Sequence, residues 1–220
     1  MIAWDAIDCV LFDMDGTLLD LHFDNHFWLE HLPLRYGQLH QLDLAAAKQV
    51  LYPKFHAKRG SLDWYCVDYW SQQLGVDIEA LKKEVVDRIA LRPHAVDFLN
   101  WLRSQHKRCV LITNAHRKSL ELKVAHTALD AYFEQMISSH DFGFAKEQDE
   151  FWSELSSRQH IDLRRALFID DSLDVLRCAQ RNGVAQILGV AKPDSKKPEN
   201  NLSPFDIVHD FRELMTTVTA

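Results

Sequence analysis

The sequence predicts an α/β fold in which helices cover a parallel sheet and a helical segment interrupts the alternation. Two observations predict it. Short apolar runs alternate with helix-like stretches, and most of these runs end in polar residues. Over residues 20–92 the alternation stops, and only helical spacing of apolar residues is found. Because strand–helix–strand units cross over in one hand, their alternation predicts a parallel, Rossmann-like sheet with helices on both faces.

Five short runs are the predicted strands, at residues 7–12, 109–112, 136–137, 166–169 and 186–190. Their brevity favours buried strands over helices. Helices are expected between them, where apolar residues recur at helical spacing, as at Val96, Leu99 and Leu102. Residues 192–204 are rich in Lys, Pro, Asn and Ser and predict a loop. A last helix is expected near residues 206–215.

The long interval after the first strand predicts a second structural unit. Its apolar residues recur at helical spacing, for example at Phe27 and Leu32. Hinges are expected near Asp20 and at Arg92 and Pro93, where the α/β pattern restarts. The predicted division is a core of residues 1–19 and 93–220 and a helical cap of residues 20–92.

The composition excludes several classes of protein. The chain has 220 residues, a net charge of −7, 47% hydrophobic and 26% charged residues, which is ordinary for a globular protein. The acidic balance argues against a nucleic-acid polymer or an anionic membrane as partner, because both attract clustered Lys and Arg. No apolar run approaches the ~18 residues of a membrane span. The first residues lack a signal-peptide pattern, and the four dispersed cysteines predict no disulfide, so a cytoplasmic protein is expected.

Polar residues follow three of the predicted strands directly. They are Asp13 and Asp15, Thr113 and Asn114, and Asp170 and Asp171. In open parallel sheets, ligands bind at the carboxyl ends of the strands, so these side chains should meet at one edge. Crowded carboxylates repel one another unless a cation lies among them, and hard oxygen ligands favour Mg²⁺. For any single Asp, a turn or helix-cap role is the alternative.

These residues resemble the signatures of a known family. DMDGTL at residues 13–18 resembles the first signature of the haloacid dehalogenase superfamily of phosphohydrolases. LITN at 111–114 resembles its second, Lys146 its third and FIDDS at 168–172 its fourth. Their order and spacing match, and the inserted segment corresponds to the helical cap of that family. The resemblance therefore implies a phosphohydrolase with a capped Rossmann-like core.

The resemblance also implies a role for each motif residue. Asp13 would be the nucleophile that forms an aspartyl-phosphate, and Asp15 the general acid and base. Thr113 and the Asn114 backbone would bind a phosphoryl oxygen, while Lys146 would neutralise negative charge; a helix N-cap and a solvated lysine are the alternatives. A second Asp two residues after the nucleophile points to phosphoryl transfer rather than carbon–halogen chemistry.

The same resemblance implies Mg²⁺ as cofactor. The ion would be held by Asp13, the Asp15 carbonyl oxygen and the carboxylates of the fourth motif. Asp171 would coordinate it directly, whereas Asp170 would act through water, although the order of these two is open.

The cap is expected to choose the substrate. Seven of the Trp and Tyr residues lie in it, where they can stack on a planar base or fill the interior of the cap. The candidate substrate-binding residues are Asn25, His26, Trp28, Lys54, Trp64 and Tyr69. Most of the 12 histidines are expected to be ordinary surface or half-buried residues; His116 and His140, at strand ends, are the exceptions.

A narrower resemblance concerns the substrate. The segments LDLHFDN at 19–25, DWYCVDYW at 63–70 and FGFAK at 142–146 resemble bacterial purine 5′-nucleotidases of the superfamily that act on GMP and IMP. The implied partner is a small phosphorylated metabolite, a purine mononucleotide, bound to a monomer or homodimer. A sugar-phosphate or phosphoglycolate phosphatase is the alternative within the family. A phosphoacceptor receiver or non-catalytic binding module is the alternative of another class.

Overall fold

The computed structural model describes residues 2–215 and contains one parallel sheet of six strands. Their order across the sheet is β3-β2-β1-β4-β5-β6. The strands are β1 (Cys9–Phe12), β2 (Arg108–Thr113), β3 (Gln135–Ser138), β4 (Ala166–Asp170), β5 (Gln186–Val190) and β6 (Asp206–Val208). Phe12 lies opposite Leu111 of β2 and Ile169 of β4, so the three central strands end at the same edge. The predicted α/β class and the five predicted strands are confirmed.

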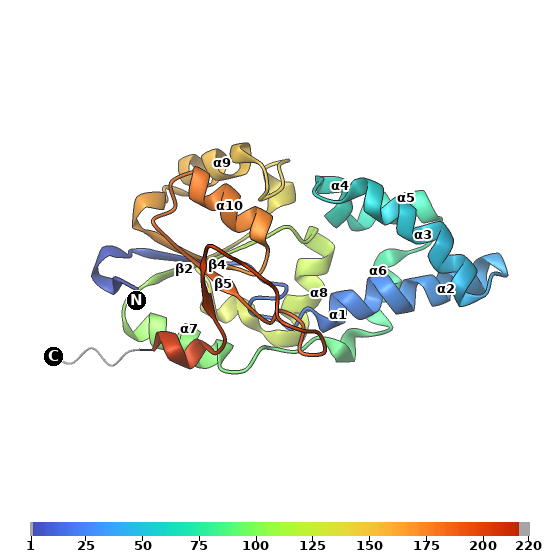
Figure 1. Cartoon of the computed structure of the whole chain (residues 1–220), viewed down its shortest axis with the longest axis horizontal. Helices are drawn as coiled ribbons and strands as arrows, with labels where there is room; N and C mark the ends of the chain where they lie inside the picture. Colours follow the sequence, from blue (N-terminus) through green and yellow to red (C-terminus); the bar gives the residue numbers. More distant parts are fainter. Residues whose placement is uncertain (1, 216–220) are drawn as a thin grey trace.

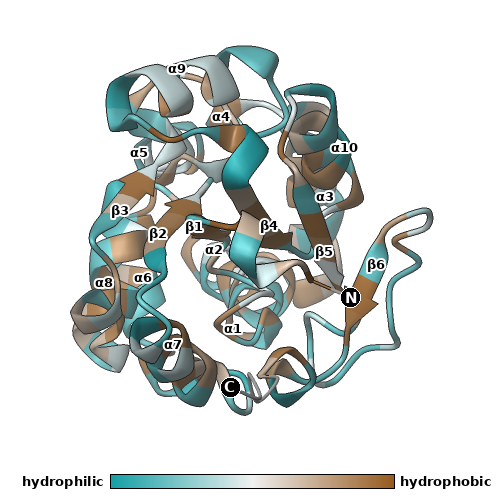
Figure 2. Cartoon of the chain, turned by 90° about the vertical axis from the view of Figure 1, so that its left-hand side faces the viewer, coloured by the Kyte–Doolittle hydropathy of each residue, from teal (hydrophilic) through white to brown (hydrophobic). Residues whose placement is uncertain are grey.

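Helices cover both faces of this sheet (Figure 2). They are α7 (Ala95–Ser104) and α8 (Arg117–Thr127) on one face, and α9 (Asp149–Gln159) and α10 (Leu173–Arg181) on the other. Because successive side chains of a strand point to opposite faces, Val10 and Phe12 pack on the side of α7, whereas Cys9 and Leu11 pack on the side of α9 and α10. Short 3₁₀ helices complete this part: η1 (Trp4–Ala6), η4 (Leu129–Tyr132), η5 (Ser139–Asp141), η6 (Leu163–Arg165) and η7 (Phe211–Leu214).

The end of the described chain differs from the prediction. Residues 192–204 form a loop, as expected. The predicted helix at residues 206–215 is wrong, because its first part is the edge strand β6, in which Asp206 lies opposite Leu188 of β5. The β-branched pair Ile207 and Val208 favours a strand, and Val208 is buried against the sheet core. Only a short 3₁₀ helix, η7, follows.

The inserted segment is helical throughout and has a hydrophobic cluster of its own. Its elements are α1 (His22–His26), η2 (Phe27–His31), α2 (Leu32–His40), α3 (Leu44–Lys58), α4 (Leu62–Tyr65), α5 (Val67–Leu74), α6 (Ile78–Lys83) and η3 (Val86–Arg88). The first three form one continuous rod with a π-helical turn. Pro33 has no N–H to donate to the Leu29 carbonyl, and the Tyr52 hydroxyl donates to that oxygen instead at 2.9 Å. Figure 1 shows these helices to the right of the sheet.

The two ends of the insertion lie side by side. Leu19 pairs with Leu91 in antiparallel fashion, and the Asp20 N–H donates to the Ala90 carbonyl at 2.9 Å. The Arg92 N–H donates to the Leu18 carbonyl at 2.9 Å. The chain thus leaves and re-enters the sheet domain at one point, near the predicted hinges. We propose on this basis, and on the separate hydrophobic cluster, that residues 20–92 act as one cap.

The four cysteines are free thiols, of which Cys66 alone is not buried. Within residues 2–215, no helix has the length and apolar character that crossing a membrane requires.

Candidate active site

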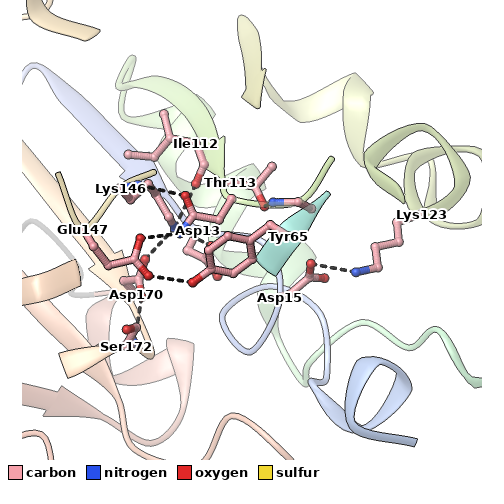
Figure 3. A network of polar contacts seen from close by, with 12 residues as sticks. Asp13, Asp15, Tyr65, Ile112, Thr113, Lys123, Lys146, Glu147, Asp170 and Ser172 are labelled. Carbon is pink, nitrogen blue, oxygen red and sulfur yellow. Dashed lines mark hydrogen bonds and ion pairs between the residues drawn. The ribbon is translucent and has the colours of Figure 1, made fainter. Parts of the chain in front are cut away.

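Lys146 lies at the centre of the acidic edge of the sheet (Figure 3). Its Nζ is 2.6 Å from Oδ1 of Asp13 and 2.7 Å from Oδ2 of Asp170, and it donates to the Ile112 carbonyl at 3.2 Å. Asp13 directly follows β1 and Asp170 ends β4, so the parallel register brings both carboxylates to the lysine. Lys146 is only 2% exposed. A buried ammonium needs such partners, so the lysine is not the solvated residue of the alternative reading.

The backbone of Lys146 is held by the second motif. Its N–H donates to Oδ1 of Asn114 at 2.9 Å, and its carbonyl accepts from the Trp152 indole at 2.8 Å. The Asn114 amide donates in turn to Glu147 at 2.8 Å. The Asn114 side chain is therefore a positioning group, which leaves its backbone N–H for a ligand. The Thr113 hydroxyl accepts from the Ala115 N–H at 3.0 Å, so its own proton can be donated elsewhere.

The helix-cap alternative for the second motif does not describe the structure. Helix α8 has His116 as its N-cap, and the side chain of that residue accepts from the Lys118 N–H. Thr113 and Asn114 lie before the cap, at the end of β2. They face the same edge of the sheet as the positive end of the α8 dipole, which is where an anion is stabilised.

The two aspartates of the fourth motif differ in their partners. Asp170 uses both carboxylate oxygens, one on Lys146 and the other as acceptor of the Ser172 N–H at 2.7 Å. Asp171 forms no ion pair within residues 2–215, and its carboxylate lies against Gly16. Asp171 is therefore the residue of this pair that has oxygens available for a metal ion.

The electrostatics of this cluster are suited to a bound cation. Burial raises the pKa of Asp13 to about 6, although Lys146 lowers it. Burial also raises the pKa of Asp171 well above its usual value, and the nearby Asp170 and Asp13 raise it further. Oδ2 of Asp13 is buried and has no hydrogen-bond partner among the described residues. Three carboxylates with one ammonium leave excess negative charge and free hard oxygens, and both features fit Mg²⁺.

A second buried network holds Asp15. Its Oδ2 is 2.6 Å from Nζ of Lys123, which also contacts Oδ2 of Asp24 at 2.7 Å. Lys82 contacts the other oxygen of Asp24 at 3.0 Å. The charges alternate from α6 of the insertion, through α1, to α8 of the core. Burial raises the pKa of Asp15 to about 7, against the opposite effect of Lys123, so a protonated fraction exists near neutral pH.

Asp24, Lys82 and Lys123 were not among the predicted site residues. The two lysines are 3% and 1% exposed, yet each lies in a helix among apolar residues. A lysine at a buried position of a predicted helix was the available signal, because such a residue requires a buried anion as its partner.

A cavity of about 580 Å³ lies between the sheet edge and the insertion. The predicted residues Asp13, Asp15, Thr113, Asn114, Lys146, Asp170 and Asp171 all line it, as do Asn25, Trp28 and Trp64 from the insertion. The insertion also contributes Tyr52, Phe55, His56, Arg59 and Tyr65. The Tyr65 hydroxyl donates to Glu147 at 2.6 Å and so connects the insertion to the core.

Three of the candidate substrate contacts do not line this cavity. Lys54 is exposed on the outer side of α3. The Tyr69 ring packs on Trp70. His26 lies between the rings of two other histidines. We propose that these three residues do not contact a ligand bound in the cavity. Asn25 does line it, but its amide donates to Asp194 at 2.7 Å, so its first role is to hold the neighbouring loop.

The close contact between Gly16 and Asp171 makes a testable prediction. A Cβ at Gly16 would lie 2.6 Å from Cγ of Asp171, and the backbone there has φ of +93°. We expect Gly16→Ala to displace the Asp171 carboxylate and to lower both Mg²⁺ affinity and turnover at least about tenfold, as loss of metal-site support does elsewhere. Gly183→Ala is the matched control, since Gly183 also has positive φ (+82°) but no atom near its Cβ position.

The control separates backbone strain from the clash. Both variants should lose stability from the positive φ, by about 1 kcal/mol. Only Gly16→Ala should weaken Mg²⁺ binding, measured by calorimetry. Equal Mg²⁺ affinity in the two variants would show that Gly16 does not position Asp171.

Together, the parallel sheet and the acidic cluster at its carboxyl edge define an enzyme of the α/β class. A family model of haloacid dehalogenase-like hydrolases matches residues 7–183. The chain belongs to this family and is a hydrolase, which removes the receiver and binding-module alternatives.

Relatives and solved structures agree with this assignment. The chain is 39% identical over 217 residues to the GMP/IMP nucleotidase YrfG of Escherichia coli K12, with 99% of this chain and 98% of that protein covered. The Shigella flexneri protein of the same name matches equally. A HAD phosphatase from Thermococcus onnurineus has the same fold, with a TM-score of 0.78, 20% identity, and 94% and 96% of the two chains covered. The Bacillus subtilis HAD-hydrolase YfnB, solved with bound magnesium, has a TM-score of 0.66 at 21% identity, with the same coverage.

Proposed function

We propose that this hydrolase removes the 5′-phosphate from purine nucleoside monophosphates, with GMP and IMP as substrates. The observation that carries the proposal is the joint cavity, in which phosphoryl-transfer chemistry lies at the sheet edge and aromatic side chains lie opposite it. Its volume of about 580 Å³ suits a ligand of mononucleotide size. The 39% identity with GMP/IMP nucleotidases over nearly the whole chain supports the choice of substrate.

In the first step, a carboxylate oxygen of Asp13 attacks phosphorus and the bond from phosphorus to O5′ breaks. Asp15 gives its proton to the leaving O5′. The raised pKa of Asp15, about 7, suits this donor, because general acids work best with a pKa near the working pH. Lys146 holds Asp13 in place and places a fixed positive charge where the phosphoryl oxygens gather.

In the second step, water attacks the phosphorus of the aspartyl-phosphate. Asp15, now ionised, accepts the water proton, and the bond between phosphorus and Asp13 breaks to release inorganic phosphate. Lys123 stabilises the ionised form of Asp15 at 2.6 Å, so the carboxyl group can change protonation state within each cycle. The Thr113 hydroxyl and the Asn114 N–H are the donors that we assign to a phosphoryl oxygen.

Mg²⁺ fits the residues that are present, as their excess negative charge and the free Asp13 oxygen indicate. We assign it to Asp13, the Asp15 carbonyl oxygen and Asp171. Asp170 is paired with Lys146 and is not among the ligands that we assign. When bound, the ion supplies charge neutralisation and orientation of the phosphoryl group.

The choice of 6-oxo purines is supported by the polar groups around the aromatic side of the cavity. Trp28 and Trp64 offer ring faces or edges to a planar base. Arg59 lines the same region; its backbone N–H donates to the His56 carbonyl, whereas its guanidinium group has no hydrogen-bond or ion-pair partner within residues 2–215. A guanidinium group only donates, so it matches the O6 acceptor of guanine and hypoxanthine and does not match the N6 amino group of adenine.

A phosphate-release panel tests the proposed function. GMP, IMP, AMP, CMP and sugar phosphates, phosphoglycolate included, are compared by kcat/KM, with and without EDTA. We expect GMP and IMP to lead and chelation to abolish release. In Arg59→Met, the GMP value should fall more than the AMP value, at constant thermal stability. A preference for a sugar phosphate or for phosphoglycolate would contradict the nucleotide assignment, and release unaffected by EDTA would contradict the Mg²⁺ assignment.

Binding of Mg²⁺ should depend on pH in a defined direction. Protons compete with the metal for Asp13 and Asp171, whose pKa values are raised, to about 6 for Asp13. The rise in Tm on adding Mg²⁺ should therefore be small at about pH 5 and larger at about pH 8. Differential scanning fluorimetry with and without Mg²⁺ measures this rise in Tm. The Tm in Ca²⁺-free buffer with EDTA is the metal-free reference. A Tm rise that is larger at the lower pH would contradict the carboxylate site.

A further inference from the structure

A second group of metal-ligating side chains lies outside the acidic cluster, at the contact between the insertion and the core. Ligand atoms of Cys66, His116 and His140 lie within 4.8 Å of one another. Cys66 separates α4 from α5 in the insertion, His116 caps α8 of the core, and His140 lies in η5 just after β3. The two imidazole rings meet edge to face, with their centroids 4.9 Å apart.

Each of the two imidazole rings has a nitrogen available as a ligand. Nε2 of His140 is buried and has no hydrogen-bond partner in the described chain. Burial and the neighbouring His116 lower the pKa of His140 to about 4, so its ring is neutral at pH 7, as a metal ligand must be. Nδ1 of His116 accepts from the Lys118 N–H, which leaves Nε2 of that ring free.

The sulfur of Cys66 lies at the start of α5, where the Tyr69 N–H donates to it at 3.3 Å. Asp68 lies 3.7 Å from Nε2 of His116 but is already paired with Lys118 at 2.6 Å. The available set is thus one cysteine sulfur and two imidazole nitrogens, which leaves a fourth position for water.

We propose that Cys66, His116 and His140 form a Zn²⁺ site that clamps the insertion to the core. One Cys and two His is a ligand set that Zn²⁺ accepts in tetrahedral sites with a water, whereas Mg²⁺ requires oxygen ligands. Zn²⁺ holds nitrogen and sulfur at ~2.0–2.3 Å, so a contraction of the group by roughly one ångström completes the site. The site is separate from the acidic cluster and takes a different metal.

The position of the site gives it a consequence for turnover. Cys66 directly follows Tyr65, whose hydroxyl already connects the insertion to Glu147 beside the cavity. A metal ion that joins Cys66 to two core histidines holds this closed contact in place. Substrate entry and product release require the cavity to open, so occupancy of the site slows turnover while it stabilises the fold.

Co²⁺ titration tests binding directly, because a thiolate ligand gives a sulfur-to-cobalt charge-transfer band. The full chain is titrated in excess Mg²⁺ with a phosphine reductant, so that the acidic cluster is filled and the thiols are reduced. We expect one equivalent to give the band and Zn²⁺ to displace it. Cys66→Ser should lose the band, and His116→Gln and His140→Gln should weaken Co²⁺ binding at least about tenfold. His126→Gln, at an exposed position of α8, is the matched control and should bind normally.

Circular dichroism checks that each variant is folded. If Cys66→Ser is unstable, His116→Gln, at a half-buried position, serves as the second test. A band that survives in Cys66→Ser, or that is absent from the wild type, overturns the proposal. In a phosphate-release assay, Zn²⁺ should inhibit the wild type more strongly than Cys66→Ser, and equal inhibition overturns the clamp. The absorption readout needs no substrate, so failure of the nucleotide assignment would not affect it.

Discussion

Asp13→Asn is expected to lower kcat for phosphate release by about 10³-fold or more, as removal of the nucleophile does in other enzymes with covalent intermediates. The amide keeps the shape of the side chain but cannot form the bond to phosphorus. Lys146 keeps its contact with Asp170 at 2.7 Å, so the interior remains paired. We expect the free energy of unfolding to change by only about 1–2 kcal/mol.

The direction of that stability change also follows from the structure. In the folded, metal-free chain the pKa of Asp13 is about 6, above its ordinary value of 3.8. A carboxyl group with a raised folded-state pKa contributes stability below pH 4, and this contribution is lost as the pH rises through 6. The wild type should therefore lose stability relative to Asp13→Asn between about pH 4 and 7. Urea unfolding at several pH values measures this difference.

Asp8→Asn is the control for Asp13→Asn. Asp8 lies just before the other end of β1 and forms a surface pair with Arg165. Exposed pairs contribute at most about 1 kcal/mol, so this variant should keep both its activity and its stability. If Asp13→Asn retained substantial turnover while Asp8→Asn behaved normally, another residue would have to be the nucleophile.

Lys123→Met is expected to have the largest effect on stability. Its ammonium group joins Asp15 and Asp24 at 2.6 and 2.7 Å, and the residue is 1% exposed. Methionine fills a similar volume but leaves Asp24 with Lys82 alone and Asp15 with no ion-pair partner among residues 2–215. Breaking a buried ion pair in this way costs about 3–5 kcal/mol. Turnover should fall as well, because the ionised form of Asp15 loses its stabilising charge.

Lys118→Met on the same helix is the matched control. Lys118 pairs with Asp68 at 2.6 Å, but both side chains are about half exposed. The free energy of unfolding should change by less than about 1 kcal/mol in this variant. Chemical denaturation of both variants measures the contrast. Similar losses in the two would mean that the Asp15 network contributes no more than a surface pair.

The double variant Lys123→Met with Asp24→Leu tests whether the four charges act as one network. It removes one charge of each sign, but Asp15 and Lys82 then lose their partners. Stability should stay below that of the wild type, because the four charges form one alternating chain rather than two separable pairs. If the double variant were as stable as the wild type, the loss of stability in Lys123→Met would come from the unpaired Asp24 alone.

The fold was predictable where the sequence pattern is local. Short apolar runs that end in polar residues predicted five strands, because a buried parallel strand is apolar on both faces and its carboxyl end carries the ligand-binding groups. The error at Asp206–Val208 has a physical reason. Three residues are too few to show a periodicity, and their strand state depends on pairing with β5, a contact that no local pattern reveals.

In the site, the residues at strand ends were predictable, whereas the ion pairs between helices were not. The side chains that follow β1, β2 and β4 come together because the register aligns those strand ends. The network of Asp24, Lys82 and Lys123 joins residues separated by 58 and 99 positions in the sequence. Its members lie in three helices, and the pairing depends on how the insertion sits on the core. The same dependence explains why the sequence alone could not show that Arg59, rather than Lys54, lines the cavity.

The neighbouring ends of the insertion have a consequence for how such chains diverge. Since Leu19 and Leu91 already pair, a direct connection between them would close a loop of a few residues, at little cost in chain entropy. The sheet and its acidic edge would keep their connectivity, while Trp28, Arg59 and Trp64 would be lost together. On the proposed function, the stretch that selects the substrate is largely separable from the side chains that cleave it, although Asp24 and Lys82 of the insertion belong to the network around Asp15. Replacing residues 20–92 is the change expected to alter which phosphate ester is accepted and to leave intact the side chains that cleave it.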